Sequence, residues 1–269
     1  MISLSDLKKF KSQGRKFSCL TCYDASMAKA MEIAQVDSIL IGDSLGMAIQ
    51  GHDSTLPVTV EDMAYHTAAV RRGNQHAFIM TDLPFMSYAT LQDALQSAKQ
   101  VMQAGAQMIK IEGGAWLSES VRVLTQNGIP VCVHLGLTPQ SVHVFGGYKL
   151  QAKTRDAADR LIADCQAVVD AGAAILLLEC VPAQLGEEIA QLFPEVPVIG
   201  IGAGNQTDGQ VLVVQDMLGL TFGKLARFVR NFMKEQSGET AIVDAMKAYH
   251  AAVQDQSFPA PEHTFQVEL

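Results

Sequence analysis

The amino-acid sequence predicts an α/β protein, a single (β/α)8 barrel of the TIM-barrel type that spans residues 1–269. The chain has 269 residues, and such barrels typically need about 250. Short apolar runs alternate with helical patterns, and no linker rich in proline and serine divides the chain. Hydrophobic residues make up 48% and charged residues 18%, a composition that can bury one large core and that argues against disorder.

Eight apolar runs of strand length are the predicted strands of the barrel. They cover residues 17–22, 38–43, 77–82, 107–112, 130–134, 174–179, 196–201 and 211–216. The segments between them carry helix signals. Thr90 precedes Asp93 by three residues, which is a helix-capping pattern, and an apolar face with helical spacing follows as far as Gly105. Thr59 and Asp62 open the preceding helix in the same way.

The chain after about residue 221 lies outside the repeating pattern. We expect helices at 222–236 and 239–254, followed by a proline-containing tail at 259–269. We assign residues 221–269 to contacts with the barrel or with a neighbouring subunit, and we expect the last residues to be mobile.

Charge and composition exclude several classes of partner. The formal net charge is -8 and the sequence pI is about 5.3, which disfavours binding to nucleic acid or to anionic membranes because both are negatively charged. A small-molecule partner is therefore expected. The first residues lack the apolar core of a secretory signal, and no apolar run approaches the roughly 18 residues of a membrane span. The sequence thus predicts a cytoplasmic protein.

The five cysteines are predicted to be reduced thiols in the core. They are odd in number and lie in apolar surroundings, unlike a disulfide framework. Cys19 and Cys22 form a C-x-x-C pattern, but on a strand their sulfurs face opposite sides and cannot share a metal ion or a disulfide.

The stretch 108–112, MIKIE, carries opposite charges on a strand that otherwise has the composition of a buried one. Successive strand residues point to opposite faces, so Met108, Lys110 and Glu112 share one face while Ile109 and Ile111 share the other. Lys110 could be a core ion pair with Glu112. Burying such a pair is seldom net stabilising, so we prefer a role for Lys110 in binding an anionic substrate.

Acidic residues recur where predicted strands end, and these ends form the mouth of the active site in a parallel barrel. The polar residues at these ends are Asp43, Asp82, Glu112, His134 and Glu179. Carboxylates buried together require a compensating cation. Oxygen ligands without thiolates or a histidine pair match Mg2+, so the first-choice ligands are Asp43 and Asp82, with Glu112 binding directly or through water.

Two further signals leave alternatives open. Strand-terminal acids also cap helices or begin turns, and His134 by itself is as consistent with a structural role as with a site role. The sequence GIGAGN at 200–205 contains part of a dinucleotide-binding pattern, but it lacks the full spacing and the acidic partner. In a barrel this position often binds phosphate or lets backbone approach a ligand.

Several linked motifs resemble the ketopantoate hydroxymethyltransferase family over residues 4–233. The matching segments are TCYD from Thr21, GDSLGM from Gly42, GHDSTLPVTVEDMAYHTAAVRRG from Gly51, TDLPFMSY from Thr81, KIEGG from Lys110, VCVHLGLTPQSV from Val131, LLECVP from Leu177 and IGIGAGNQTDGQVLV from Ile199. The resemblance implies a barrel of the phosphoenolpyruvate/pyruvate type. It also implies transfer of a one-carbon unit from 5,10-methylenetetrahydrofolate to 3-methyl-2-oxobutanoate, giving 2-dehydropantoate in pantothenate biosynthesis.

The resemblance also implies roles for particular residues. Asp43, Asp82 and Glu112 match the family's Mg2+ site, and Glu179 matches the proposed proton acceptor in a mechanism that passes through a Mg2+-stabilised enolate. The substrate contacts implied in this way are Asp43, Ser44, Asp82 and Lys110. Family members form homo-oligomers, commonly decamers, so a homo-oligomer is expected.

Two other functions fit parts of the sequence. A related Mg2+-dependent barrel lyase or mutase would use the same acids on another 2-oxo acid. Such relatives usually carry a reactive cysteine in a lysine-lysine-cysteine-glycine-histidine stretch, which this sequence lacks. A nucleotide- or metabolite-binding module built around GIGAGN would move no proton, so it would not need Glu179.

Overall fold

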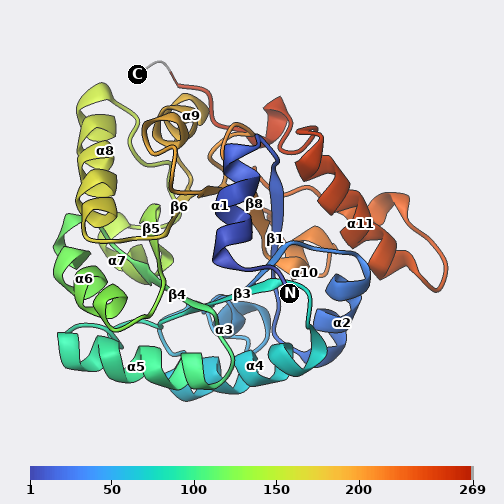
Figure 1. Ribbon diagram of the computed structural model, residues 1–269. Coiled ribbons are helices and arrows are strands. Elements are labelled where there is room, and N and C mark those ends of the chain that lie inside the picture. Colours follow the sequence, from blue (N-terminus) through green and yellow to red (C-terminus); the bar gives the residue numbers. More distant parts are fainter. Residues whose placement is uncertain (268–269) are drawn as a thin grey trace.

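The structure, a computed structural model that describes residues 1–267, is a closed barrel of eight parallel strands (Figure 1). The strands pair in sequence order, and β8 closes the barrel against β1. They are β1 (Phe17–Thr21), β2 (Ser38–Ile41), β3 (Phe78–Asp82), β4 (Met108–Glu112), β5 (Val131–Gly136), β6 (Ile175–Glu179), β7 (Val198–Ile201) and β8 (Gly209–Leu212). The predicted fold class is confirmed.

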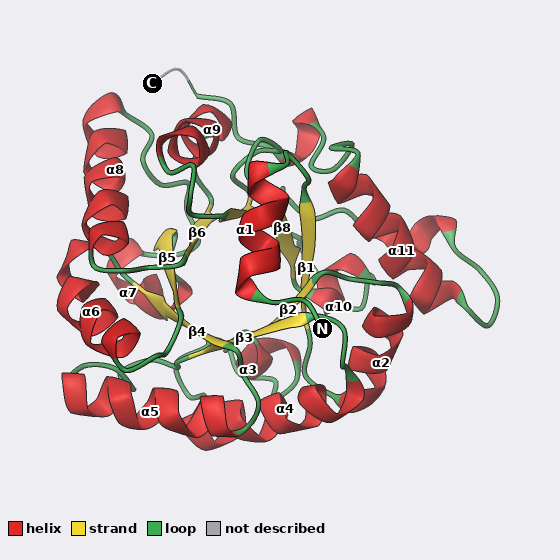
Figure 2. Cartoon of the chain, viewed as in Figure 1, coloured by secondary structure: helices red, strands yellow, loops and turns green. Residues whose placement is uncertain are grey.

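Helices surround the strands, as Figure 2 shows by colour. The longer helices after the first strand are α2 (Ala25–Ile33), α4 (Val60–Gly73), α5 (Leu91–Gln103), α6 (Ser118–Gln126), α8 (Arg155–Asp170), α9 (Ala183–Leu192) and α11 (Ala241–Gln254). Three helices of four residues follow strand ends: α3 (Leu45–Ala48), α7 (Val142–Phe145) and α10 (Val214–Met217). Helix α1 (Leu4–Ser12) precedes the barrel.

The predicted capping patterns are present. The Thr59 hydroxyl accepts a hydrogen bond from the Asp62 backbone N–H, and the Asp62 carboxylate accepts from the Thr59 N–H. Thr90 likewise accepts from the Asp93 N–H at the start of α5. These bonds satisfy N–H groups that have no partner within the helix, and they fix where each helix leaves its strand.

The buried apolar residues form two clusters. The interior cluster fills the barrel, and the outer layer lies between the strands and the helices. Inward-facing residues such as Cys19, Met80 and Met108 belong to the interior cluster, while Ile109 and Ile111 belong to the outer layer. Helix α1 closes the N-terminal end of the barrel, because Leu7 is fully buried in the interior cluster and Leu4 packs against it. In Figure 1, α1 lies across the middle of the ring of strands.

The cysteine prediction is confirmed, since all five thiols are free and buried. Cys19 lies inside the barrel and Cys22 lies in the outer layer, as the alternation of strand side chains requires.

Two element predictions near the C-terminus are wrong. The eighth strand begins at Gly209 rather than 211 and ends at Leu212, because the chain then turns into α10 within the same apolar run. The expected helix at 222–236 is largely an extended loop with a short 3-10 helix, η3 (Phe232–Glu235). Its apolar residues face different partners. Phe228 packs against the barrel, while Phe232 contacts the rings of Tyr249 and Phe258.

The rest of the C-terminal segment packs on its own barrel. The Tyr249 hydroxyl of α11 donates to the carbonyl oxygens of Cys19 and Gln210, at 2.9 and 2.8 Å. Of the tail that we expected to be mobile, residues up to Val267 are attached to α9 through backbone oxygens of Phe265 and Val267; residues 268–269 lie outside the described range. No helix within residues 1–267 is both long and apolar enough to cross a bilayer.

Candidate active site

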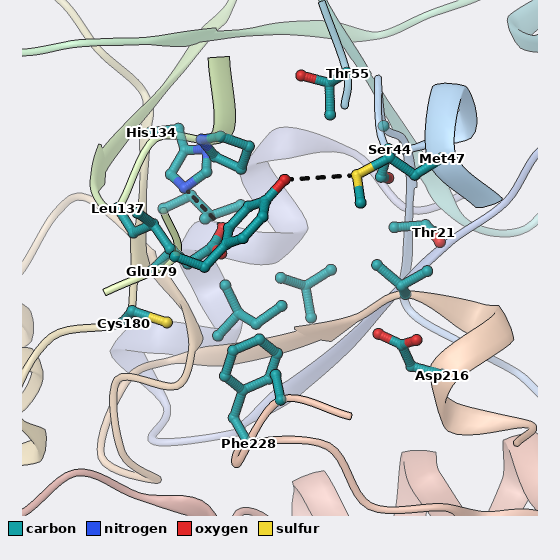
Figure 3. A pocket seen from close by; sticks show the side chains of 18 of the residues that line it. Thr21, Ser44, Met47, Thr55, His134, Leu137, Glu179, Cys180, Asp216 and Phe228 are labelled. Atoms are coloured by element: carbon teal, nitrogen blue, oxygen red, sulfur yellow. Dashed lines mark hydrogen bonds and ion pairs between the residues drawn. The ribbon is translucent and has the colours of Figure 1, made fainter. Parts of the chain in front are cut away.

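A cavity of about 640 Å3 opens at the C-terminal ends of the strands. Its lining includes all the residues singled out from the sequence: Asp43, Ser44, Asp82, Lys110, Glu112, His134 and Glu179. Figure 3 shows Glu179 and His134 on one side of this cavity and Ser44 on another. The arrangement follows from the parallel strands, whose carboxyl ends all meet at one rim.

The strand register explains why the charged residues are neighbours. Asp82 pairs with Lys110, Glu112 pairs with His134, and Gly136 pairs with Glu179. Paired residues on adjacent parallel strands face the same side of the sheet, so Lys110 and Glu112 point into the barrel as the alternation in MIKIE predicts.

Lys110 is the central cation of the site. Its Nζ lies 3.0 Å from Asp82 Oδ1 and 3.5 Å from Glu112 Oε1, and the Lys110 and Asp82 side chains are each only 3% exposed. The Asp82 Oδ1 atom lacks a well-aligned hydrogen bond, so the contact is an ion pair. Burial lowers the pKa of Lys110, but the surrounding carboxylates outweigh it and the net shift is upward. Lys110 therefore stays charged.

The three acids exceed the positive charge near them. Burial, together with repulsion from Asp82 and Glu112, raises the pKa of Asp43 well above 3.8. Burial also raises the pKa of Asp82, although Lys110 opposes the shift. The Asp43 backbone N–H donates to Asp82 Oδ2 at 3.1 Å, which brings the two residues together. Because an added cation would relieve this repulsion, the pair fits a hard divalent ion.

Glu112 differs from the two aspartates because it already has several partners. Its Oε2 accepts from the Gln140 backbone N–H at 2.9 Å, and its Oε1 lies 3.1 Å from His134 Nδ1. Burial opposes ionisation, but His134, Lys110 and these hydrogen bonds lower the pKa of Glu112 overall. Within residues 1–267, no three acidic, histidine or cysteine side chains form a ready metal-binding cluster. Because both oxygens of Glu112 already have partners, the oxygens of Asp43 and Asp82 are the better candidates for direct ligation.

Glu179 lies at the end of β6, with His134 between it and Glu112. His134 Nε2 lies 3.3 Å from Glu179 Oε2, and the Glu179 side chain is 13% exposed. Burial and Lys110 lower the pKa of His134, but the two glutamates outweigh them and the net shift is upward. The sequence left a structural role and a site role open for His134, and its position in the cavity lining favours the site role.

Ser44 begins the short helix α3 but does not cap it. Its Oγ lies 2.9 Å from the Tyr23 hydroxyl. Both side chains belong to the β1 and β2 ends of the barrel, so Ser44 has a polar partner and lines the cavity beside Asp43.

The sequence analysis missed Gln140, which connects the acids. Its Nε2 donates to Asp43 Oδ2 and to the Leu83 carbonyl, both at 2.9 Å, while its Oε1 accepts from the Tyr88 hydroxyl at 2.5 Å. Together with its backbone bond to Glu112, these contacts fix two acids from one loop. The residue lies in the matched segment VCVHLGLTPQSV, so the signal was its place after the fifth strand.

The glycine-rich loop at 200–205 does not form an open phosphate cradle. A side chain at Gly200 would meet Thr207 at 2.7 Å, and one at Gly202 would meet the Phe228 ring at 2.8 Å. The space beside Gly204 is taken by Ala183, again at 2.8 Å. The glycines are needed because the protein's own side chains pack against them, which counts against the binding-module alternative.

Comparison with known proteins identifies the family. A family model described as ketopantoate hydroxymethyltransferase matches residues 1–261. The chain belongs to this family. Proteins named 3-methyl-2-oxobutanoate hydroxymethyltransferase from Acinetobacter baylyi and Acinetobacter baumannii are 90% and 88% identical to it, with all of each chain covered. The resemblance stated from the motifs is confirmed, and the chain is an enzyme of this hydroxymethyltransferase family.

Solved structures of lower identity share the barrel. A 2,3-dimethylmalate lyase, titled a PEP mutase/isocitrate lyase superfamily member, has a TM-score of 0.59 at 15% identity, with 82% of this chain and 84% of that chain covered. A phosphonopyruvate hydrolase in complex with oxalate and Mg2+ has a TM-score of 0.62 at 12% identity, covering 96% and 100%. At these identities the likeness concerns the fold alone, and it agrees with the (β/α)8 barrel expected from the sequence.

Proposed function

We propose that this protein transfers a hydroxymethyl group from 5,10-methylenetetrahydrofolate to 3-methyl-2-oxobutanoate, giving 2-dehydropantoate. Family membership and the names of the 88–90% identical relatives support the reaction. The observation that carries it is the excess of buried carboxylate over positive charge at the barrel mouth, beside a further carboxylate at Glu179. Such a site suits a 2-oxo acid bound together with a divalent cation, with Glu179 beside them as the base.

The cation we propose is Mg2+, held by Asp43 and Asp82, with Glu112 binding directly or through water. When bound, it would supply Lewis-acid stabilisation of negative charge on the oxo acid. The oxygen-only donor set fits this ion. A phosphonopyruvate hydrolase with the same fold holds Mg2+ together with oxalate, a dicarboxylate whose adjacent oxygens are placed like the carboxylate and 2-oxo oxygens of a 2-oxo acid.

The chain's own residues then have distinct tasks. We assign Lys110 and Ser44 to the oxo acid, with Lys110 offering a buried positive charge to its carboxylate. Glu179 accepts the proton from C3 on a carboxylate oxygen. His134 is the neighbour of this base: its Nε2 lies 3.3 Å from the carboxylate without the alignment of a hydrogen bond, and its Nδ1 contacts Glu112.

The carbon–carbon bond forms after this proton is removed. The one-carbon unit is bonded to two folate nitrogens. The electron pair left at C3 attacks it as the first carbon–nitrogen bond breaks, and water then displaces the second nitrogen, with each broken bond leaving its electrons on nitrogen, which takes up a proton. Water supplies the oxygen of the new hydroxyl group, so the overall reaction consumes one water. The apolar lining of the cavity, which includes Leu137 and Leu177, limits access of other water to the carbanion-like centre.

The test is Glu179→Gln. We expect this change to leave binding of Mg2+ and the oxo acid largely intact and to nearly abolish deuterium exchange at C3, which is followed by NMR without folate. The matched control is Glu188→Gln on α9, an exposed glutamate paired with Arg155, which should exchange at the wild-type rate. Exchange persisting at the original rate in Glu179→Gln would remove Glu179 as the base.

The related lyase or mutase has the same barrel, but family membership favours the hydroxymethyltransferase over it. Wild-type protein with Mg2+, 5,10-methylenetetrahydrofolate and 3-methyl-2-oxobutanoate distinguishes the two. Formation of 2-dehydropantoate supports our proposal, whereas no turnover under these conditions favours a lyase or mutase.

A further inference from the structure

The cavity has a second region that the oxo acid and its cation do not need. Its volume of about 640 Å3 falls within the roughly 300–1,000 Å3 of pockets that bury drug-sized ligands. Beyond the acids, apolar side chains from β7, β8 and the C-terminal segment form its walls. They are Ile201, Val211, Val213, Leu225, Phe228 and Phe265. This region suits a larger, flat second substrate.

One carboxylate, Asp216, stands in this apolar region. It belongs to α10, directly after β8, and Figure 3 shows it across the cavity from Glu179, with Phe228 on the same lower side of the view. Its Oδ1 accepts a hydrogen bond from the Thr221 hydroxyl at 2.6 Å. Within residues 1–267 no cation lies within ion-pair distance of this carboxylate, and burial raises the pKa of Asp216. A half-buried carboxylate with one neutral partner still has room for hydrogen-bond donors.

We propose that Asp216 binds the donor edge of a reduced pterin, with the ring against Phe228. The N3–H and 2-amino groups of a pterin point in parallel within one plane, so they match the two oxygens of a carboxylate as an arginine fork does. Such a pairing fixes the ring orientation and desolvates both partners together. This inference rests on the proposed function, because it assigns the site of the folate co-substrate.

The charges at the rim of the cavity fit the other end of a folate. Lys224 and Arg227 line the rim and are exposed, although the protein as a whole carries a net charge of -8. Arg227 donates from Nε to the Glu262 carbonyl at 3.1 Å and lies over the Phe265 ring. A folate carries carboxylates on its glutamate tail, so the half-buried Asp216 would bind the pterin while these cations attract the tail.

The experiment is calorimetry on the full-length enzyme with Mg2+ and 3-methyl-2-oxobutanoate, using tetrahydrofolate and the tailless 6-methyltetrahydropterin as probes. For Asp216→Asn we expect both affinities to fall at least about tenfold, because a charged hydrogen-bond acceptor is lost. Lys224→Ala should lower the affinity for tetrahydrofolate by about two- to fivefold and leave the affinity for the tailless pterin unchanged.

The matched control is Asp244→Asn, which alters an exposed aspartate that also accepts from a threonine, Thr240, at 2.6 Å. It should bind both probes as the wild type does. Affinities of Asp216→Asn within twofold of wild type for both probes overturn the assignment.

A measurement on the wild type keeps the inference testable if Asp216→Asn does not fold. The 2-desamino-2-methyl analogue of tetrahydrofolate lacks the amino donor, so it should bind at least about tenfold more weakly than tetrahydrofolate. Equal binding of the two compounds overturns the assignment. Wild-type turnover separates the two proposals: if the wild type makes 2-dehydropantoate but does not discriminate these compounds, only the Asp216 assignment fails.

Discussion

Asp43 is held in an unfavourable state when no cation is present, and this has a consequence for stability. Burial and the charges of Asp82 and Glu112 raise its pKa above 3.8 in the folded protein. The folded state therefore holds this proton more tightly than the unfolded state does. Stability falls as pH rises wherever the folded state binds more protons, so the loss begins near the ordinary carboxyl range and continues upward through the raised pKa.

We predict that wild-type protein in EDTA loses stability between about pH 5 and about pH 8 relative to Asp43→Asn, which cannot ionise. Added Mg2+ should reduce this loss, because the ion binds the charged form of the carboxylate. Urea unfolding of both proteins at the two pH values, with and without Mg2+, measures the effect. A difference between the two proteins that is the same at both pH values would contradict the prediction.

The convergence of the acids could be predicted from the sequence, but their connections could not. Asp82, Glu112 and Glu179 end strands, and parallel strands bring their ends to one rim. Gln140 lies in a single 3-10 turn after β5 and Tyr88 lies in a turn after β3, and segments this short carry no periodic pattern that fixes the direction of a side chain. Their contacts with the acids depend on loop conformations that only the folded structure defines.

At the scale of elements, α11 packs on the barrel through several buried apolar residues, and the buried hydroxyl of Tyr249 adds hydrogen bonds to this contact. The Tyr249 hydroxyl donates to carbonyls of both β1 and β8, the pair that closes the barrel. We predict that Tyr249→Phe lowers the free energy of unfolding by about 1–3 kcal/mol, because two buried carbonyls lose a donor. Tyr65→Phe on α4 is the control, since Tyr65 is 70% exposed, and it should change stability by less than about 0.5 kcal/mol.

Urea unfolding measures both tyrosine variants. Equal stabilities for Tyr249→Phe and the wild type would show that the hydroxyl does not contribute to attaching α11.

The strands were more predictable than the C-terminal segment for a physical reason. Seven apolar runs end at a charged residue, a glycine or a turn, which marks the boundary of the strand. The run VLVVQD continues without a break from β8 into α10, and a few apolar residues do not distinguish the two conformations. Residues 222–236 have helical spacing, but Phe228 packs against both the interior cluster and the outer layer while Phe232 packs on Tyr249 and Phe258, so tertiary packing overrides the pattern.

At the scale of the whole molecule, the two ends of the barrel have separate tasks. Helix α1 fills the N-terminal end, while every residue assigned to the proposed reaction lies at the C-terminal end. The homo-oligomer expected from the family resemblance stays a prediction, and an assembly that leaves the mouth accessible is compatible with this division.

The division predicts that stability and chemistry can be changed independently. Leu7 is fully buried in the interior cluster, so Leu7→Ala should lower the free energy of unfolding by about 2–5 kcal/mol through lost burial and a cavity. The rate of C3 deuterium exchange per folded molecule should stay close to wild type, because the positions of the acids depend on the strand register rather than on α1.

Lys8→Ala, on the exposed side of the same helix, is the control and should alter neither the stability nor the exchange rate. Urea unfolding and NMR exchange, measured on the same samples, test the expected loss of stability and the expected unchanged exchange rate. If folded Leu7→Ala protein exchanged as slowly as Glu179→Gln, helix α1 would be needed to position the catalytic residues, and the prediction would be wrong.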